Sequence, residues 1–337
     1  MHNNRKTGKA ISRRALVAGA AAGTVALASD PALAQRCPAN PPAHMQGPLV
    51  WMNMDQHELD ESYDQSVYAF NQRHIQERRD ERNQLMAKIL GKPERVAYGS
   101  GEMDKVDIYK TKRVNAPTLM YLHGGSWQGG RSAQGAYLAE PFVHAGANFI
   151  NVEFTNVREL NGDLFPMVDH CRRAVAWTYR NAKSFGGDPN ALYLAGFSSG
   201  GHRGGCVVAT EWEKQGMPRD ILKGALLGSG IYDLKPARQS KRGNYVKFTD
   251  AMEQELSAQR YIDRIHAPLV LTTGMLETPD FQRQTRDFAA ALAKAGKPVK
   301  LIAAKGHNHF EMGESLSNPY GIMGRAAMEM MKLTNAA

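Results

Sequence analysis

Cysteine is scarce in this sequence: its 337 residues include three, Cys37, Cys171 and Cys206. An odd number of thiols cannot all pair, and no C-x-x-C or other metal-ligand spacing occurs, so no disulfide framework and no metal site are expected. Cys171 and Cys206 fall in predicted helices, where buried free thiols are expected. One disulfide involving Cys37 stays open.

Long apolar runs and blocks of one charge are also lacking. Beyond residue 34, no apolar run approaches the ~20 residues of a membrane-spanning helix, so no stable membrane anchor is expected. Five of the 42 basic and one of the 33 acidic residues lie in the first 34, which leaves 37 basic and 32 acidic residues, a net charge of +5. These charges alternate in sign, as over residues 76–82, which predicts a solvated helix face and no nucleic-acid partner.

The first 34 residues have the composition of an export signal. Arg13 and Arg14 precede an apolar stretch rich in Ala and Gly (15–23), and Ala32-Leu33-Ala34 follows as a small-residue cleavage site. The arginine pair indicates a bacterial twin-arginine signal. The stretch is short for a membrane anchor, which is the alternative. We therefore predict processing after Ala34 by the twin-arginine export machinery and a periplasmic or secreted protein.

The remaining chain alternates between strand-like and helix-like patterns. Residues 35–94 hold a Pro-rich linker (38–48) and predicted N-terminal helices (55–90), and residues 95–337 form the main domain. Strands are predicted at 106–109, 117–122, 147–154, 191–195, 224–229, 268–273 and 299–303, and helices at 166–184, 200–214, 279–295 and 319–334. This order predicts an α/β fold with a mostly parallel central sheet covered by helices on both faces. A charged insertion at 235–262 is predicted to form a small cap.

One pentapeptide carries most of the chemical information. Residues 196–200 read Gly-Phe-Ser-Ser-Gly, the G-x-S-x-G pattern of a nucleophile elbow, in which a tight strand-to-helix turn exposes one serine. In a chain with 32 glycines the pattern could arise by chance, or as a serine cap of an ordinary helix. An apolar strand pattern before it and a helix pattern after it favour Ser198 as a nucleophile.

A serine nucleophile needs a histidine base and a carboxylate that orients it. In an elbow fold these follow the serine in the order acid, then histidine, each after a strand. After the strand at 268–273, Glu277 lies in the loop and is favoured as the acid, whereas Asp280 is placed to start a helix. After the last strand, His309 is favoured over His307 because the loop must fold back over the serine.

A loop after an early strand supplies candidate oxyanion donors. The strand at 117–122 runs into His123-Gly124-Gly125-Ser126-Trp127. We expect the backbone N–H groups of Gly125, Ser126 and Ser199 to face the carbonyl oxygen of a substrate. His123 is expected to hold the loop, and His202 to pack within its helix, in place of a catalytic role.

Together these motifs resemble the α/β-hydrolase superfamily, in its esterase/lipase branch that includes arylformamidase (kynurenine formamidase)-like proteins. The resemblance covers roughly residues 95–315 and rests on the His-Gly-Gly-Ser-Trp loop, the Phe185-Gly-Gly-Asp turn, the elbow and the segment 274–284. It implies a catalytic triad of Ser198, Glu277 and His309. Ser126, Phe197 and Ser199 depart from the usual residues of that group, and so does Glu277, because the acid of the triad is more commonly an aspartate.

These observations predict a serine carboxylesterase that works through an acyl-enzyme without metal or cofactor, on a small-molecule ester. Trp127, Phe197, the insertion and the N-terminal helices are the candidate pocket walls. The alternative is an amide or formamide hydrolase of the arylformamidase type using the same residues. Export favours the ester, because the resemblance places formamide hydrolysis in cytoplasmic tryptophan breakdown. A non-catalytic binding protein on a hydrolase scaffold is the third hypothesis.

Overall fold

The computed structural model describes residues 44–333. The predicted export signal and Cys37 lie outside this range, so the expectations for them stay predictions. Within the range, no helix is long and apolar enough to cross a membrane. Cys171 and Cys206 are buried free thiols, as expected.

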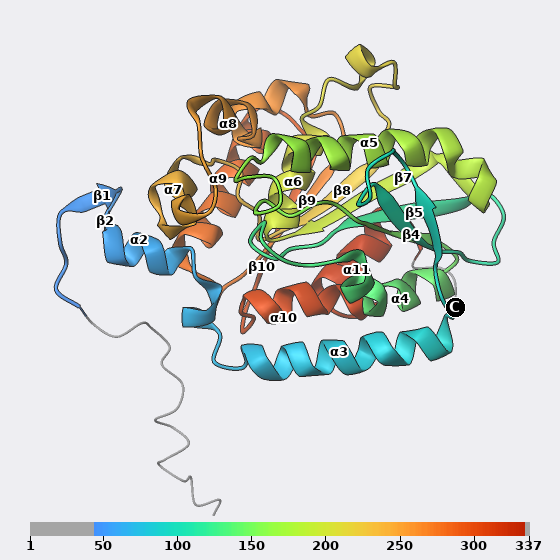
Figure 1. The fold of residues 1–337 in the computed structure, drawn as a ribbon, viewed down its shortest axis with the longest axis horizontal. Coiled ribbons are helices and arrows are strands. Elements are labelled where there is room, and N and C mark those ends of the chain that lie inside the picture. Colours follow the sequence, from blue (N-terminus) through green and yellow to red (C-terminus); the bar gives the residue numbers. More distant parts are fainter. Residues whose placement is uncertain (1–43, 334–337) are drawn as a thin grey trace, which may run out of the picture. The chain divides into compact units, whose positions relative to one another are not determined.

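An eight-stranded sheet forms the centre of the fold (Figure 1). Its order is β10-β9-β8-β7-β5-β6-β4-β3. Strands β5 to β10 pair in parallel, and β4 and β3 extend one edge in antiparallel pairing. The strands are β3 (Glu94–Ala97), β4 (Lys105–Tyr109), β5 (Ala116–Leu122), β6 (Asn148–Val152), β7 (Gly187–Phe197), β8 (Gly224–Gly228), β9 (Leu269–Gly274) and β10 (Val299–Ala304).

Side chains alternate between the two faces of the sheet along each strand, and in the inner strands β5, β6 and β8 they are buried on both faces. In β5, Met120 and Leu122 belong to one hydrophobic core and Leu119 and Tyr121 to the other. Helices α5, α6 and α9 contribute to the first core, and α4, α10 and α11 to the second; in Figure 1 α5 and α6 lie above the sheet and α4 and α11 below it. Their bounds are α4 (Ala139–His144), α5 (Phe165–Asn181), α6 (Ser199–Val208), α9 (Pro279–Lys294), α10 (His309–Glu314) and α11 (Ile322–Met330). The predicted sheet with helices on both faces is confirmed.

Several shorter elements had no signal in the sequence. The edge strand β3 reads Glu-Arg-Val-Ala and is mostly exposed, so it lacks the apolar pattern of a buried strand. Helix α4 is six residues long and contains Pro141. The chain also forms short 3₁₀ helices at η2 (Ser132–Leu138), η3 (Ala182–Phe185), η4 (Trp212–Gln215) and η7 (Ser315–Ser317).

The predicted N-terminal helices are present and pack against the domain. This part comprises β1 (Leu49–Trp51), β2 (Met54–Asp55), α2 (Gln56–Ser62), η1 (Gln65–Tyr68) and α3 (Gln72–Ile89). Helix α3 packs against α10. The guanidinium of Arg78 donates two hydrogen bonds to the carboxylate of Glu314, and Arg82 donates to Ser317. These contacts tie α3 to the segment that follows the last strand.

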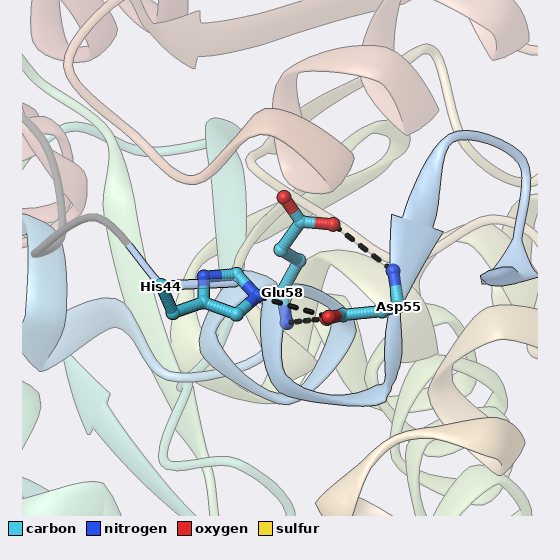
Figure 2. A group of neighbouring side chains, drawn as sticks. All are labelled: His44, Asp55 and Glu58. Carbon is cyan, nitrogen blue, oxygen red and sulfur yellow. Dashed lines mark hydrogen bonds and ion pairs between the residues drawn. The ribbon is translucent and has the colours of Figure 1, made fainter. Parts of the chain in front are cut away.

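A compact polar cluster, His44, Asp55 and Glu58, starts helix α2 (Figure 2). Asp55 accepts the backbone N–H of Glu58, and Glu58 accepts that of Asp55, which is a capping box. His44 and the N–H of Gly47 bind the second Asp55 oxygen, and these hydrogen bonds hold the pKa of Asp55 well below its usual range. Because the helix cap uses these oxygens, the cluster is explained without a metal ion.

The insertion at 235–262 folds into short helices, α7 (Lys235–Gln239), η5 (Lys241–Asn244), α8 (Asp250–Glu255) and η6 (Ala258–Arg264). Its charges pair with one another: Arg238 binds Asp250 and Glu253, and Arg260 binds Glu253. This pairing accounts for a charged segment that nevertheless folds into short helices.

We predict that Tyr63→Phe lowers the free energy of unfolding by about 1–3 kcal/mol, because it leaves a buried carboxylate with one hydrogen bond fewer. The Tyr63 hydroxyl donates to Asp280, which is fully buried, at 2.7 Å, and so joins the N-terminal part to α9. Burial raises the pKa of Tyr63, so the donor proton is retained. Urea unfolding measures the change. Tyr68→Phe is the control, since the Tyr68 hydroxyl makes no hydrogen bond to the residues described, and equal losses in both variants would contradict the prediction.

Candidate active site

Ser198 occupies the turn between β7 and α6. Its φ of 57° and ψ of −124° are a strained conformation for a residue with a side chain. The turn is held because α6 begins in contact with the end of β5: a Cβ on Gly200 would collide with the carbonyl oxygen of Leu122, and one on Gly196 with that of Gly200. Glycine is therefore required on both sides of Ser198.

His309 faces Ser198 across this turn. The Ser198 Oγ lies 2.9 Å from His309 Nε2, within hydrogen-bond distance, and both residues are buried. His309 is the first residue of α10, whose N-cap is Asn308. The Asn308 side chain accepts the N–H groups of Phe310 and Glu311, and Glu311 binds back to the Asn308 N–H. This capping box fixes where the imidazole points.

Glu277 approaches the other nitrogen of His309. Its Oε2 lies 3.2 Å from His309 Nδ1, and its Oε1 accepts the Ser229 hydroxyl at 2.6 Å and the Gly274 N–H at 2.8 Å. Ser229 was not expected from the sequence; its position directly after β8, at the carboxyl end of the sheet, was the available signal. The carboxylate therefore has a fixed orientation toward the imidazole.

Asp280, the alternative acid, has other partners. It accepts hydrogen bonds from Tyr63 at 2.7 Å and from Arg283 at 2.7 Å, and makes none with His309. The structure thus brings together Ser198, His309 and Glu277. His307 is partly buried, and its Nδ1 lies 2.9 Å from the Lys305 carbonyl oxygen, away from Ser198.

The loop after β5 lies beside Ser198 in an unusual backbone conformation. Gly125, Ser126 and Trp127 have φ values of 117°, 54° and 63°. A Cβ on Gly125 would collide with the carbonyl oxygen of Gly129, so this position requires glycine. Within residues 44–333 the N–H groups of Gly125 and Ser126 make no loop hydrogen bond, and Ser199 N–H starts α6. These are the three donors expected from the sequence.

A pocket of about 690 Å³ opens over Ser198 and His309. Phe197 lines it, and its ring lies 4.7 Å from the imidazole of His309. Trp127 does not line it, contrary to expectation. It is 1% exposed and lies beneath the loop, where its Nε1 donates to His202 Nδ1 at 3.1 Å. Because the indole N–H finds a buried partner, the side chain turns into the core.

The outer wall of the pocket comes from the N-terminal part of the chain. Side chains of 63–66 and of one face of α3 line it, together with the loop after β5. No residue of the 235–262 insertion does so, although that segment was expected to contribute a wall. The N-terminal helices are the other wall expected from the sequence, and the lining by α3 confirms it, although α3 is charged on every side and shows no distinct apolar face.

His123 and His202 are buried histidines that hold the loop. Nδ1 of His123 donates to the carbonyl oxygen of Gly124 at 2.8 Å, and Nε2 of His202 donates to that of Leu256 at 3.0 Å. Burial, followed by the charge of Arg203, lowers the pKa of each to about 3. Both rings are therefore neutral at physiological pH, in agreement with the structural roles expected of them.

Arg203 is a buried cation that sequence reasoning missed. It is 1% exposed, donates to the carbonyl oxygen of His123, and lies 3.9 Å over the ring of Phe154. Burial lowers its pKa to about 10, so it is still charged at neutral pH. It connects α6, five residues after Ser198, to the start of the loop that follows β5.

These features define a class. A mostly parallel sheet carries, at the carboxyl ends of its strands, a serine in a strand-to-helix turn, a buried carboxylate and a histidine, in that chain order, which is the arrangement of an α/β hydrolase. In agreement with this class, residues 106–224 match the model of the BD-FAE family.

Among curated proteins, the chain is similar to kynurenine formamidases. It is 30% identical to that of Salmo salar over 229 residues, which cover 66% of this chain and 76% of the relative. It is 28% identical to that of Danio rerio over 243 residues, 70% of this chain and 80% of the relative. The chain belongs to the esterase/lipase family of α/β hydrolases that includes the kynurenine formamidases, and is a hydrolase of ester or amide type.

Solved structures share the fold at lower identity. Esterase LipW from Mycobacterium marinum matches with a TM-score of 0.61 and 18% identity over 80% of this chain and 90% of that chain. A thermophilic esterase from Thermogutta terrifontis matches with a TM-score of 0.59 and 21% identity, over 74% and 95% respectively. These likenesses support the architecture.

The lowered pKa values of His123 and His202 predict acid sensitivity. Their folded-state pKa values of about 3 lie below the ordinary 6.5, so the unfolded chain takes up protons first as the pH falls. The stability that each neutral ring contributes is complete above pH ~6.5 and declines toward pH ~3, by at most about 1.4 kcal/mol per pH unit for each ring. Between pH 7 and 5, His202→Gln should lose about 1–2 kcal/mol less unfolding free energy than wild type. His307→Gln, at a partly buried loop site, is the control, and an unchanged pH slope in His202→Gln would contradict the assignment.

Proposed function

We propose that this protein is a serine carboxylesterase that forms an acyl-enzyme on Ser198. One observation carries the proposal: the Ser198 Oγ lies 2.9 Å from His309 Nε2, and the opposite nitrogen faces the buried Glu277 at 3.2 Å, at the base of an open pocket. Such a chain of groups is what converts an unreactive hydroxyl into a nucleophile.

In the proposed reaction, His309 takes the Ser198 proton as Oγ attacks the carbonyl carbon of the ester. The N–H groups of Gly125, Ser126 and Ser199 stabilise the resulting oxyanion. His309 then gives its proton to the departing alcohol, and the acyl group stays on Ser198. A water molecule, deprotonated by the same imidazole, releases the acid. Every proton transfer in these reaction steps passes through His309, so the proposed reaction requires no cofactor.

Glu277 is proposed to orient and stabilise the imidazolium that forms in both steps. Support comes from its two further hydrogen bonds, from Ser229 and the Gly274 N–H, which stop the carboxylate from rotating away. A carboxylate held in this way keeps the Nδ1 proton in place, so that Nε2 is free to accept from the serine.

A formamide or other amide hydrolase is the second candidate, favoured by the identity with kynurenine formamidases. The same residues would serve, with His309 protonating a departing nitrogen. We favour an ester because we also propose that the export signal at 1–34 sends the protein to the periplasm or outside the cell. The substrate is proposed to be a small molecule.

Ser198→Ala is expected to lower kcat for an aryl acetate by about 10³–10⁶-fold with folding intact, because the nucleophile is gone.

Glu277→Gln should lower kcat by about 10²–10⁴-fold, since the imidazole loses its orientation. Asp280→Asn is the matched control at the neighbouring carboxylate: it should lower stability and leave kcat close to wild type. Steady-state kinetics and thermal unfolding measure both effects. A kcat loss in Asp280→Asn that equals the loss in Glu277→Gln would reject the assignment of the acid.

Turnover of N-formylkynurenine against that of an aryl acetate separates the two candidates. A carboxylesterase is expected to show a kcat/KM for the ester at least about 10²-fold above that for the formamide, because an amide is the less reactive substrate and needs its nitrogen protonated. A higher value for the formamide would establish the second candidate. No turnover of either, together with no labelling by a fluorophosphonate, would support the binding-protein hypothesis.

A further inference from the structure

The pocket wall formed by α3 carries a cation without a counter-ion. Arg79 lines the pocket and is about half-buried. Its Nη2 donates to the Phe310 carbonyl oxygen at 2.8 Å, whereas its Nε is buried and has no partner. No carboxylate within residues 44–333 forms an ion pair with Arg79. The guanidinium therefore has no counter-ion within this range, and its Nη1, which is not buried, makes no hydrogen bond there.

This guanidinium lies close to the groups that surround Ser198. Phe310, whose carbonyl it binds, directly follows His309 in the chain. Gly313 lies between the guanidinium and the Phe197 ring: a Cβ on Gly313 would be 2.9 Å from that ring and 3.0 Å from Arg79 Nη2. Arg79 also lies 5.9 Å from the ring centre of Tyr137, another pocket residue. A substrate bound to Ser198 would extend past this cation.

Neighbouring arginines of α3 show the contrast. Arg78 pairs with Glu314, and Arg82 binds the hydroxyl and carbonyl of Ser317. Neither lines the pocket. Arg79, which lies between them in the sequence, lines the pocket and has no carboxylate partner within residues 44–333, because Glu314 is paired with Arg78.

A second guanidinium lines the pocket from the loop after β5. Arg131 uses Nη2 to pair with Glu159 at 3.0 Å, but its Nη1 is buried without a partner. Two carboxylates also line the pocket. Asp64 is neutralised by Lys241 at 2.5 Å, and Asp80 is exposed. The unpaired buried donors of the pocket wall thus belong to two cations.

We propose that the substrate carries a carboxylate besides its scissile bond, and that Arg79, assisted by Arg131 from the loop after β5, binds this carboxylate. The proposal rests on the proposed hydrolase function and names the substrate class of that site. A half-buried cation without a counter-ion is unfavourable, and a carboxylate satisfies a guanidinium through charge-assisted hydrogen bonds. A substrate with this group accepts from the N–H groups that the Arg79 guanidinium leaves accessible, whereas a neutral ester leaves the cation without a counter-ion.

Two pairs of esters test the proposal. One pair is the 4-nitrophenyl monoester of adipic acid and its terminal amide; the other is the acetate ester of 4-hydroxyphenylacetate and of its amide. In at least one pair, wild type should show a kcat/KM about 10–100-fold higher for the anion, carried mainly by KM. Arg79→Gln should reduce this ratio to near one, and Arg79→Lys should retain part of it. Arg73→Gln removes the same charge from an exposed site of α3 and should keep the ratio.

If Arg79→Gln lowered kcat/KM equally for both members of each pair, the proposal would be overturned, because Arg79 would then only position the chain around His309. A ratio near one in wild type for both pairs would overturn it as well, while turnover of the neutral esters would still support the hydrolase. Calorimetry with monomethyl adipate on Ser198→Ala, with and without Arg79→Gln, needs no turnover. Binding of monomethyl adipate that is lost in Arg79→Gln would support the anion site even if the protein hydrolysed no ester. The absence of ester hydrolysis would count against the proposed function and leave the anion site standing.

Discussion

The structure depends on the close packing of the first turn of α6 against the end of β5. The carbonyl oxygen of Leu122 occupies the space that a side chain at residue 200 would need. This approach forces Ser198 into its strained turn and places the loop that follows β5 next to it. The carboxyl ends of β8, β9 and β10 then bring Ser229, Glu277 and the segment leading to His309 to the same edge of the sheet.

Most of the framework could be predicted, because its signals are local. Apolar runs followed by loops marked the parallel strands, and the order of serine, acid and histidine after three of them pointed to one site. Placement relative to a helix start separated Glu277 from Asp280: the structure pairs the first with His309 and the second with Tyr63 and Arg283. The departures from prediction concern contacts between segments far apart in the chain.

The pocket walls illustrate that limit. Trp127 is a large aromatic in a loop beside the serine, and nothing in the sequence shows that a histidine 75 residues later accepts its N–H. Helix α3 has charges on all sides, and only packing against α10 decides that Arg79 faces the pocket while Arg78 pairs with Glu314. Arg203, likewise, looks like a surface residue of α6 until the fold buries it. The periodicity of apolar residues predicts which side of a helix is buried, and a buried arginine is an exception to that pattern.

The central claim is that Ser198 is the nucleophile. Its most direct test is covalent capture: reaction of the protein with a fluorophosphonate, followed by intact mass and peptide mapping. The account predicts one adduct per chain, on Ser198, formed much more slowly in His309→Ala at unchanged fold. An adduct on another residue, or equal labelling of the His309→Ala protein, would contradict it.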